Sequence, residues 1–234
     1  MTGGLLVKVC GVTRPEDAQL CAALGADLLG FIFHPQSPRC APPGLPASPA
    51  VRDLSGVRTV GVFVAQSLDE TLALLDAGRL DLAQLHGGQD QAFCAALAER
   101  IGPERIIKVV WPEQAAGPAE FQAELDRFAP CCGRFLADAG AGGGGHGRVI
   151  GGAGASAPET PGALDLAVFP RPLILAGGLR PGNLTAMLAR YLPMGVDLNS
   201  GVESAPGVKD EKLLRAAFAE IAAARAAKQH EVRP

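Results

Sequence analysis

The chain has 234 residues, of which 48% are hydrophobic, and its formal net charge is -3. This balance excludes the broad basic surface of a nucleic-acid-binding protein and the Lys/Arg run that binds anionic membranes. The stretch "TGGLLVKVCG" (2–11) lacks the basic and long apolar regions of a signal peptide, and no apolar run is long enough to span a bilayer. We therefore expect a soluble, cytoplasmic protein with no nucleic-acid or membrane partner.

Short apolar runs recur along the chain and are separated by segments of helical pattern. Each run is nearly continuously apolar, which is typical of parallel strands that are covered on both faces. Eight such strands are predicted, at residues 5–11, 27–33, 58–64, 80–87, 105–111, 133–140, 171–179 and 195–203.

The segments between the strands carry helix start and stop signals. Pro15 is expected at the first position of the first helix and Gly25 at its end. Ser67 and Glu70 have the spacing of a capping box. Two units are irregular. The proline-rich stretch after the second strand predicts a short or irregular second helix, and the stretch 140–155 after the sixth strand is a glycine-rich loop.

The alternation of strands and helices predicts a single (β/α)8 barrel over residues 1–234, with a frayed tail from about residue 228. An open, doubly wound sheet is the alternative. The G-x-G-x-x-G fingerprint that would favour a dinucleotide-binding version of that sheet is absent after the first strand.

In such a barrel the active site lies at the carboxyl ends of the strands. The first strand ends on Cys10 and the sixth on Asp138, so a thiol and a carboxyl group form a candidate acid–base pair. Lys8 points to the same side of its strand as Cys10, and a cation there would favour the thiolate. The alternative is that Cys10 is a small core residue and that Lys8 pairs with a carboxylate.

The seventh and eighth strands end on small residues that can present backbone N–H groups to an anion. Gly177, Gly178, Ser200 and Gly201 are therefore candidate phosphate ligands.

Four polar residues at or near strand ends are candidate substrate contacts: Lys8 and the three that follow. The guanidinium of Arg39 suits a planar carboxylate, although a solvated loop arginine has the same sequence signature. His86 is a candidate ligand contact or a turn histidine, and Asp197 lies on the eighth strand. The six cysteines include no C-x-x-C pair and none lies at zinc-finger spacing from a histidine, so no metal site is predicted.

Taken together, these stretches resemble the phosphoribosylanthranilate isomerase family of tryptophan biosynthesis. The resemblance covers nearly the whole chain in the right order. It is carried by "KVCGVT" (8–13), "GADLLGFIFHPQSPR" (25–39), "VGVFV" (60–64), "LAQLHG" (82–87), "FLADAG" (135–140), "LAGGLRPGN" (175–183) and "DLNSGVE" (197–203).

The resemblance implies an Amadori rearrangement of a phosphorylated sugar–anthranilate substrate, with no metal or organic cofactor, by a monomer or a homodimer. It assigns Cys10 as the general base, Asp138 as the general acid and Arg39 as the ligand of the anthranilate carboxylate. Two alternatives are a histidine-pathway isomerase of the same fold and a non-catalytic barrel that binds a phosphorylated ligand. The former family carries an aspartate where this chain has Cys10.

Overall fold

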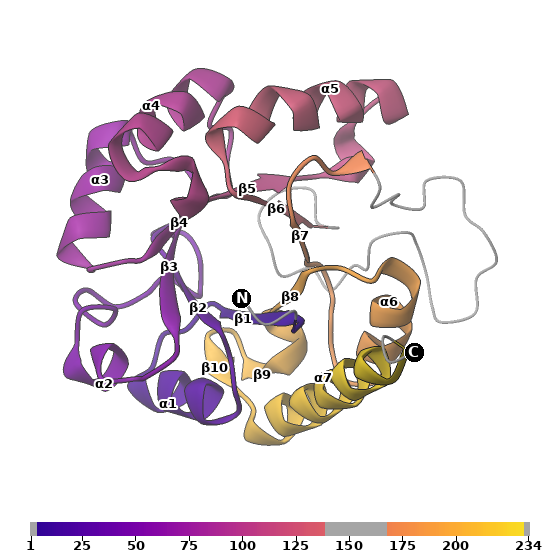
Figure 1. Cartoon of the computed structure of the whole chain (residues 1–234). Helices are drawn as coiled ribbons and strands as arrows, with labels where there is room; N and C mark the ends of the chain where they lie inside the picture. The colour runs from indigo at the N-terminus through magenta and orange to yellow at the C-terminus, as the bar shows by residue number, and fades with distance from the viewer. Residues whose placement is uncertain (1–3, 139–167, 232–234) are drawn as a thin grey trace.

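Eight parallel strands close into a barrel at the centre of the molecule (Figure 1). The computed structural model describes residues 4–138 and 168–231. Each strand pairs with its neighbour in chain order, and β1 pairs with β8 to close the ring. The strands are β1 (Leu6–Cys10), β2 (Leu28–Ile32), β3 (Arg58–Phe63), β4 (Leu82–Leu85), β5 (Ile106–Val110), β6 (Arg134–Ala137), β7 (Leu173–Leu175) and β8 (Gly195–Leu198). The predicted barrel is confirmed, and the open sheet is excluded.

Helices surround this ring of strands, as Figure 1 shows. The α-helices are α1 (Pro15–Ala23), α2 (Pro49–Arg52), α3 (Leu68–Ala77), α4 (Gln91–Ile101), α5 (Pro118–Phe128), α6 (Leu184–Tyr191) and α7 (Glu211–Glu231). Single 3-10 turns are η1 (Pro103–Arg105), η2 (Pro112–Gln114), η3 (Ala129–Cys131) and η5 (Ser200–Val202). None of the helices in the described ranges is long and apolar enough to cross a membrane.

The helix signals in the sequence are largely confirmed. Pro15 is the first residue of α1, and the second helix is short, as predicted. The Ser67 hydroxyl accepts from the Glu70 N–H while the Glu70 carboxylate accepts from the Ser67 N–H, which is the predicted capping box. The glycine-rich stretch 140–155 lies outside the described residues. Helix α7 extends to Glu231, and a frayed tail from about 228 stays a prediction.

Two predicted strands were too long at their carboxyl ends. Strand β7 ends at Leu175, and Gly177 and Gly178 follow with φ of +87° and +61°, a conformation that cannot continue a strand. Strand β8 ends at Leu198 and the chain then turns through η5. Beyond it, β9 (Glu203–Ala205) and β10 (Val208–Lys209) form a small antiparallel hairpin that was not predicted from the sequence.

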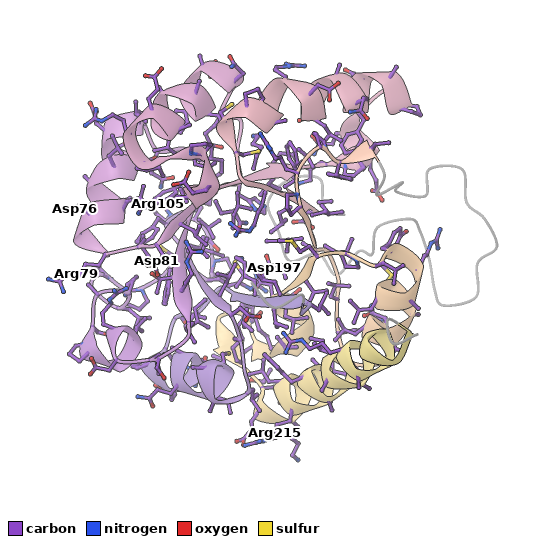
Figure 2. The ribbon with its side chains drawn as sticks, in the orientation of Figure 1. Asp76, Arg79, Asp81, Arg105, Asp197 and Arg215 are labelled. Atoms are coloured by element: carbon purple, nitrogen blue, oxygen red, sulfur yellow. The ribbon has the colours of Figure 1, made fainter. Side chains whose placement is uncertain are left out.

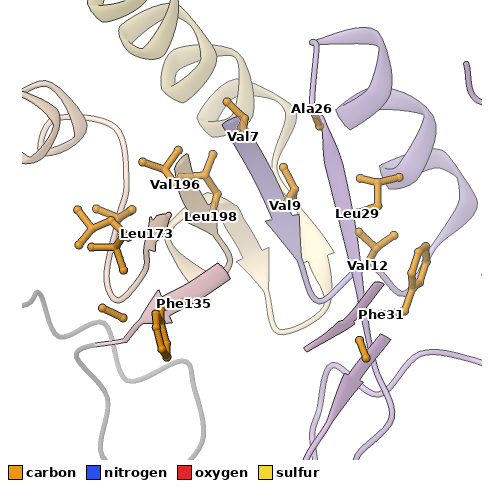
Figure 3. Packing of buried hydrophobic residues seen from close by; sticks show 14 of the residues in the cluster. Val7, Val9, Val12, Ala26, Leu29, Phe31, Phe135, Leu173, Val196 and Leu198 are labelled. Atoms are coloured by element: carbon orange, nitrogen blue, oxygen red, sulfur yellow. The ribbon is translucent and has the colours of Figure 1, made fainter. Parts of the chain in front are cut away.

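Alternation along the strands divides the core into two layers. Side chains that point outward, such as Val9, Leu29 and Phe135, pack beneath the helices (Figure 3). Side chains that point inward fill the barrel with a separate apolar cluster that includes Leu28, Val60, Leu82, Ile107, Leu136 and Ile174. Burial on both sides explains why the strands are nearly continuously apolar.

Candidate active site

Lys8 and Asp197 form an ion pair inside the barrel. The Lys8 ammonium donates to both carboxylate oxygens of Asp197, at 3.0 and 2.9 Å, and the Lys8 side chain is 0% exposed. The pair exists because β1 lies beside β8, with Lys8 opposite Asp197 in the register. Figure 2 shows Asp197 within the ring of strands. The predicted alternative for Lys8, pairing with a carboxylate, is therefore what the structure shows.

Gly30 on β2 makes room for the two inward side chains of β1. A Cβ at this position would lie 2.8 Å from the Cys10 Sγ and 2.9 Å from the Lys8 Nζ. Both distances are shorter than van der Waals contact, so only glycine allows the thiol and the ammonium to lie together here. The same geometry confirms that Lys8 and Cys10 share the inner face of β1.

Burial governs the protonation of these groups. Burial by itself would lower the pKa of Lys8, but the neighbouring Asp197 and Cys10 raise it above its ordinary value, so Lys8 is protonated. Burial raises the pKa of the Cys10 thiol, and the opposing effect of Lys8 is not large enough to reverse this. Lys8 by itself lowers the pKa of Cys10, as expected from the sequence. The expectation of a favoured thiolate is nevertheless wrong, because burial and the charge of Asp197 raise this pKa by more than Lys8 lowers it.

Asp138 lies directly after β6, next to His86, which follows β4. The His86 Nε2 is 3.8 Å from an Asp138 carboxylate oxygen. Burial, followed by the charges of Lys8 and Lys108, lowers the pKa of His86 to about 4. The histidine is therefore neutral near pH 7, and the contact is not an ion pair.

Two side chains orient the His86 ring. The Gln84 amide nitrogen lies 3.1 Å from the His86 Nδ1, and the Trp111 ring makes an edge contact with the imidazole at 5.7 Å between centroids. If the Gln84 amide donates to Nδ1, the His86 proton is on Nε2, the nitrogen that faces Asp138. The Gln84 Oε1 and the Trp111 Nε1 are buried with no hydrogen-bond partner among the described residues.

Arg39 lies over the turn that follows Cys10. A Cβ at Gly11, whose φ is +71°, would be 3.0 Å from the Arg39 Cδ and 2.8 Å from the Asn199 Oδ1. The Arg39 side chain is 10% exposed, and its guanidinium pairs with Glu203. The predicted solvated-loop alternative for Arg39 is therefore wrong, because β9 brings a carboxylate against it.

The loops after β7 and β8 lie against each other. A Cβ at Gly201 would be only 2.0 Å from the Leu179 carbonyl oxygen, so the close approach requires glycine. In the described part of the chain, the N–H groups of Gly177, Gly178, Ser200 and Gly201 donate to no backbone acceptor. Backbone N–H groups of this kind can bind an anion, and the assignment of these four residues to a phosphate stays a prediction.

Three residues that shape the site were not predicted from the sequence: Gly30, Glu203 as the partner of Arg39, and Lys209. A Pro206-Gly207 turn between two short segments was the signal for the hairpin that carries the latter two. Among the described residues, no group of three or more His, Cys, Asp or Glu side chains could hold a metal ion.

A thiol and a carboxyl group thus end different strands of one closed barrel, and the loops after β7 and β8 carry N–H groups that donate to no backbone acceptor among residues 4–138 and 168–231. The arrangement places the protein among the (β/α)8-barrel enzymes that work by general acid–base catalysis.

Comparison with known proteins narrows this class. The family model described as N-(5'phosphoribosyl)anthranilate (PRA) isomerase matches residues 7–220. The N-(5'-phosphoribosyl)anthranilate isomerase of Maridesulfovibrio salexigens is 50% identical over 222 residues, which cover 93% of this chain and 98% of the relative. The enzyme of the same name from Desulfovibrio desulfuricans is 43% identical over 215 residues, 92% of this chain and 94% of the relative.

The fold agrees with these sequence matches. The crystal structure of the phosphoribosyl anthranilate isomerase from Thermus thermophilus has a TM-score of 0.77 and 37% identity, and covers 94% of this chain and 100% of its own. This chain belongs to the N-(5'-phosphoribosyl)anthranilate isomerase family. The family match confirms the predicted function, an aldose–ketose isomerase of tryptophan biosynthesis.

Proposed function

We propose that this chain converts N-(5-phosphoribosyl)anthranilate into 1-(2-carboxyphenylamino)-1-deoxyribulose 5-phosphate, with Cys10 as general base and Asp138 as general acid. The observation that carries the proposal is the contrast between two environments at one barrel mouth. Cys10 lies beside a protonated lysine, and Asp138 lies beside a neutral histidine. Different environments are what let two titratable groups take opposite roles.

The reaction needs one proton donor and one proton acceptor. Asp138 protonates the furanose ring oxygen, the bond from this oxygen to C1 breaks, and the anthranilate nitrogen forms an iminium with C1. The Cys10 thiolate then takes the C2 proton, the C2–H electron pair forms the C1–C2 double bond, and the π pair of the C1–N iminium returns to nitrogen to give an enolamine. In the last step C1 gains a proton from Cys10 and the C2 hydroxyl loses its proton to the Asp138 carboxylate, which gives the ketone at C2 and returns both groups to their starting forms.

The charged groups beneath the mouth support the base. Only the deprotonated thiol can accept a proton, and Lys8 offsets part of the effect of burial on Cys10. Lys8 is completely buried, so it acts through Cys10 and Asp197. Asp197 is 8% exposed and is the member of the pair that can reach a substrate hydroxyl. His86 donates from Nε2 towards Asp138 or the substrate.

The two ends of the substrate are held on opposite sides of the reacting carbons. The backbone N–H groups of Gly177, Gly178, Ser200 and Gly201 bind the phosphate, and Arg39 binds the anthranilate carboxylate. A solved relative, 28% identical with a TM-score of 0.70, is described as a complex with reduced 1-(o-carboxyphenylamino)-1-deoxyribulose 5-phosphate. That ligand carries both anionic groups. A cytoplasmic location and a monomer or homodimer remain predictions.

The test is turnover of freshly prepared phosphoribosylanthranilate, followed by loss of its fluorescence. We expect fast decay with the wild-type chain. Asp138→Asn and Cys10→Ser should each lower kcat by about a hundredfold or more, because each removes one proton-transfer group, with a small change in the affinity for product. Decay no faster than in buffer, from a folded wild-type chain, would contradict the proposal. The bis-phosphate substrate of histidine biosynthesis and a binding assay would then separate the two alternatives.

A further inference from the structure

The guanidinium of Arg39 already pairs with a carboxylate of the protein, which offsets the positive charge that a substrate carboxylate would need. The Arg39 Nε lies 3.1 and 2.9 Å from the two Glu203 oxygens, and the Nη2 lies 2.8 Å from one of them. The two side chains are 10% and 4% exposed. A pair of this kind is neutral overall, and a buried Glu203 would repel a second carboxylate that approached Arg39.

A second cation, Lys209, contacts the same carboxylate. The Lys209 Nζ lies 2.8 Å from the Glu203 Oε1 and its side chain is 0% exposed. The same nitrogen donates to the Asn199 Oδ1 at 3.3 Å. Burial by itself would raise the pKa of Glu203, but the hydrogen bonds and charges of Arg39 and Lys209 bring it below its ordinary value, so the carboxylate is ionised.

The hairpin holds Lys209 in this place. Lys209 on β10 lies opposite Glu203 on β9 in the register. The Lys209 N–H donates to the Asp17 carboxylate on α1 at 3.2 Å, which fixes the backbone from the other side. Arg39, Glu203 and Lys209 therefore form a buried group with two positive charges and one negative charge, and its net charge is positive.

We propose that Lys209 is a positioning residue for the substrate carboxylate, because it offsets Glu203 and leaves Arg39 with a net positive charge. Glu203 occupies Nε and Nη2 and so fixes the plane of the guanidinium, and we assign the remaining nitrogen, Nη1, to the carboxylate of the substrate. Lys209 does not touch the substrate. The inference rests on the proposed role of Arg39.

A set of variants separates the effect of the charge of Lys209 from the effect of its packing. Lys209→Met keeps the length of the side chain but makes the group neutral. The double variant Glu203→Gln/Lys209→Met restores a net charge of one positive unit through Arg39 alone. Arg215→Met is the matched control, because it breaks an ion pair of 2.8 Å with Glu211 that is 59% exposed on both sides and lies on the outer face of α7 (Figure 2).

The readouts are the inhibition constants of three probes against the full chain: anthranilate, uncharged anthranilamide and inorganic phosphate. We expect Lys209→Met to raise the inhibition constant of anthranilate by about ten- to a hundredfold, which is the range for loss of a charged hydrogen bond. The inhibition constants of anthranilamide and phosphate should stay within about threefold of the wild-type values. The double variant should recover most of the anthranilate affinity. Arg215→Met should change none of the three.

Other results would overturn the inference. A merely structural role for Lys209 would weaken all three probes together and leave the double variant no better than the single one. Arg39→Met separates this from the proposed function. If it leaves anthranilate binding unchanged, the assignment of Arg39 fails and the inference fails with it. If it weakens anthranilate but Lys209→Met does not, only the inference about Lys209 is wrong.

Discussion

The buried pair of Lys8 and Asp197 can be tested by removing one partner at a time. Lys8→Met keeps most of the volume of the side chain but leaves the Asp197 carboxylate buried with no ammonium at 2.9 Å. Loss of one partner from a buried pair lowers the free energy of unfolding by about 3–5 kcal/mol. The low end of this range applies if Asp197 becomes protonated. The double variant Lys8→Met/Asp197→Leu removes both charges and should recover most of this loss.

Urea unfolding measures these differences, and the single tryptophan, Trp111, packs at the barrel mouth and serves as the fluorescent probe. A loss of about 3–5 kcal/mol moves the midpoint down by roughly 1–3 M urea for an m-value of about 2 kcal/mol per M. The exposed pair of Arg215 and Glu211 is the comparison, since Arg215→Met should change the free energy by less than about 1 kcal/mol. The reasoning is refuted if Lys8→Met costs no more than Arg215→Met, or if the double variant is as unstable as the single one.

Two further predictions concern His86 and Gly30. The pKa of His86 is about 6.5 in the unfolded chain and about 4 in the folded chain. The contribution of the neutral histidine to the free energy of unfolding is therefore fully present above pH 6.5 and is lost as the pH falls towards 4. Between pH 7 and 4.5 the wild type should lose about 2–3 kcal/mol more than His86→Asn, and equal losses in urea titrations would contradict the shift. Gly30→Ala places a Cβ 2.8 Å from the Cys10 Sγ, and it should lower stability by about 1–3 kcal/mol and displace the thiol, with a fall in kcat. Gly88→Ala, where a Cβ meets nothing within 4 Å, should be neutral in both assays, and a similar effect of the two substitutions would count against the packing argument.

Local patterns in the sequence were enough to predict the strands of the barrel and where its helices begin and end. Nearly continuous apolar runs indicate strands buried on both faces, and proline, glycine and the Ser67–Glu70 capping box mark where helices begin and end. Because the period of a strand is two, Lys8 and Cys10 had to share one face. The rule that barrel sites lie at the carboxyl ends of strands then selected Cys10, Asp138 and the glycines after β7 and β8.

The electrostatics of the site depended on contacts between distant segments. Lys8 meets Asp197 across 189 positions of sequence, and Arg39 meets Glu203 across 164, because closing the ring brings β1 and the loop after β2 beside the end of the chain. No local pattern encodes these pairings.

The sequence by itself therefore determined the barrel, its strands and most of the residues around its mouth, since these follow from short-range periodicity. Only the tertiary structure decided which charges meet and how deeply they are buried. Cys10 shows the difference. Its position beside Lys8 was readable from the strand, but the direction of its pKa shift was not, because that shift depends on burial and on Asp197 from the far end of the chain.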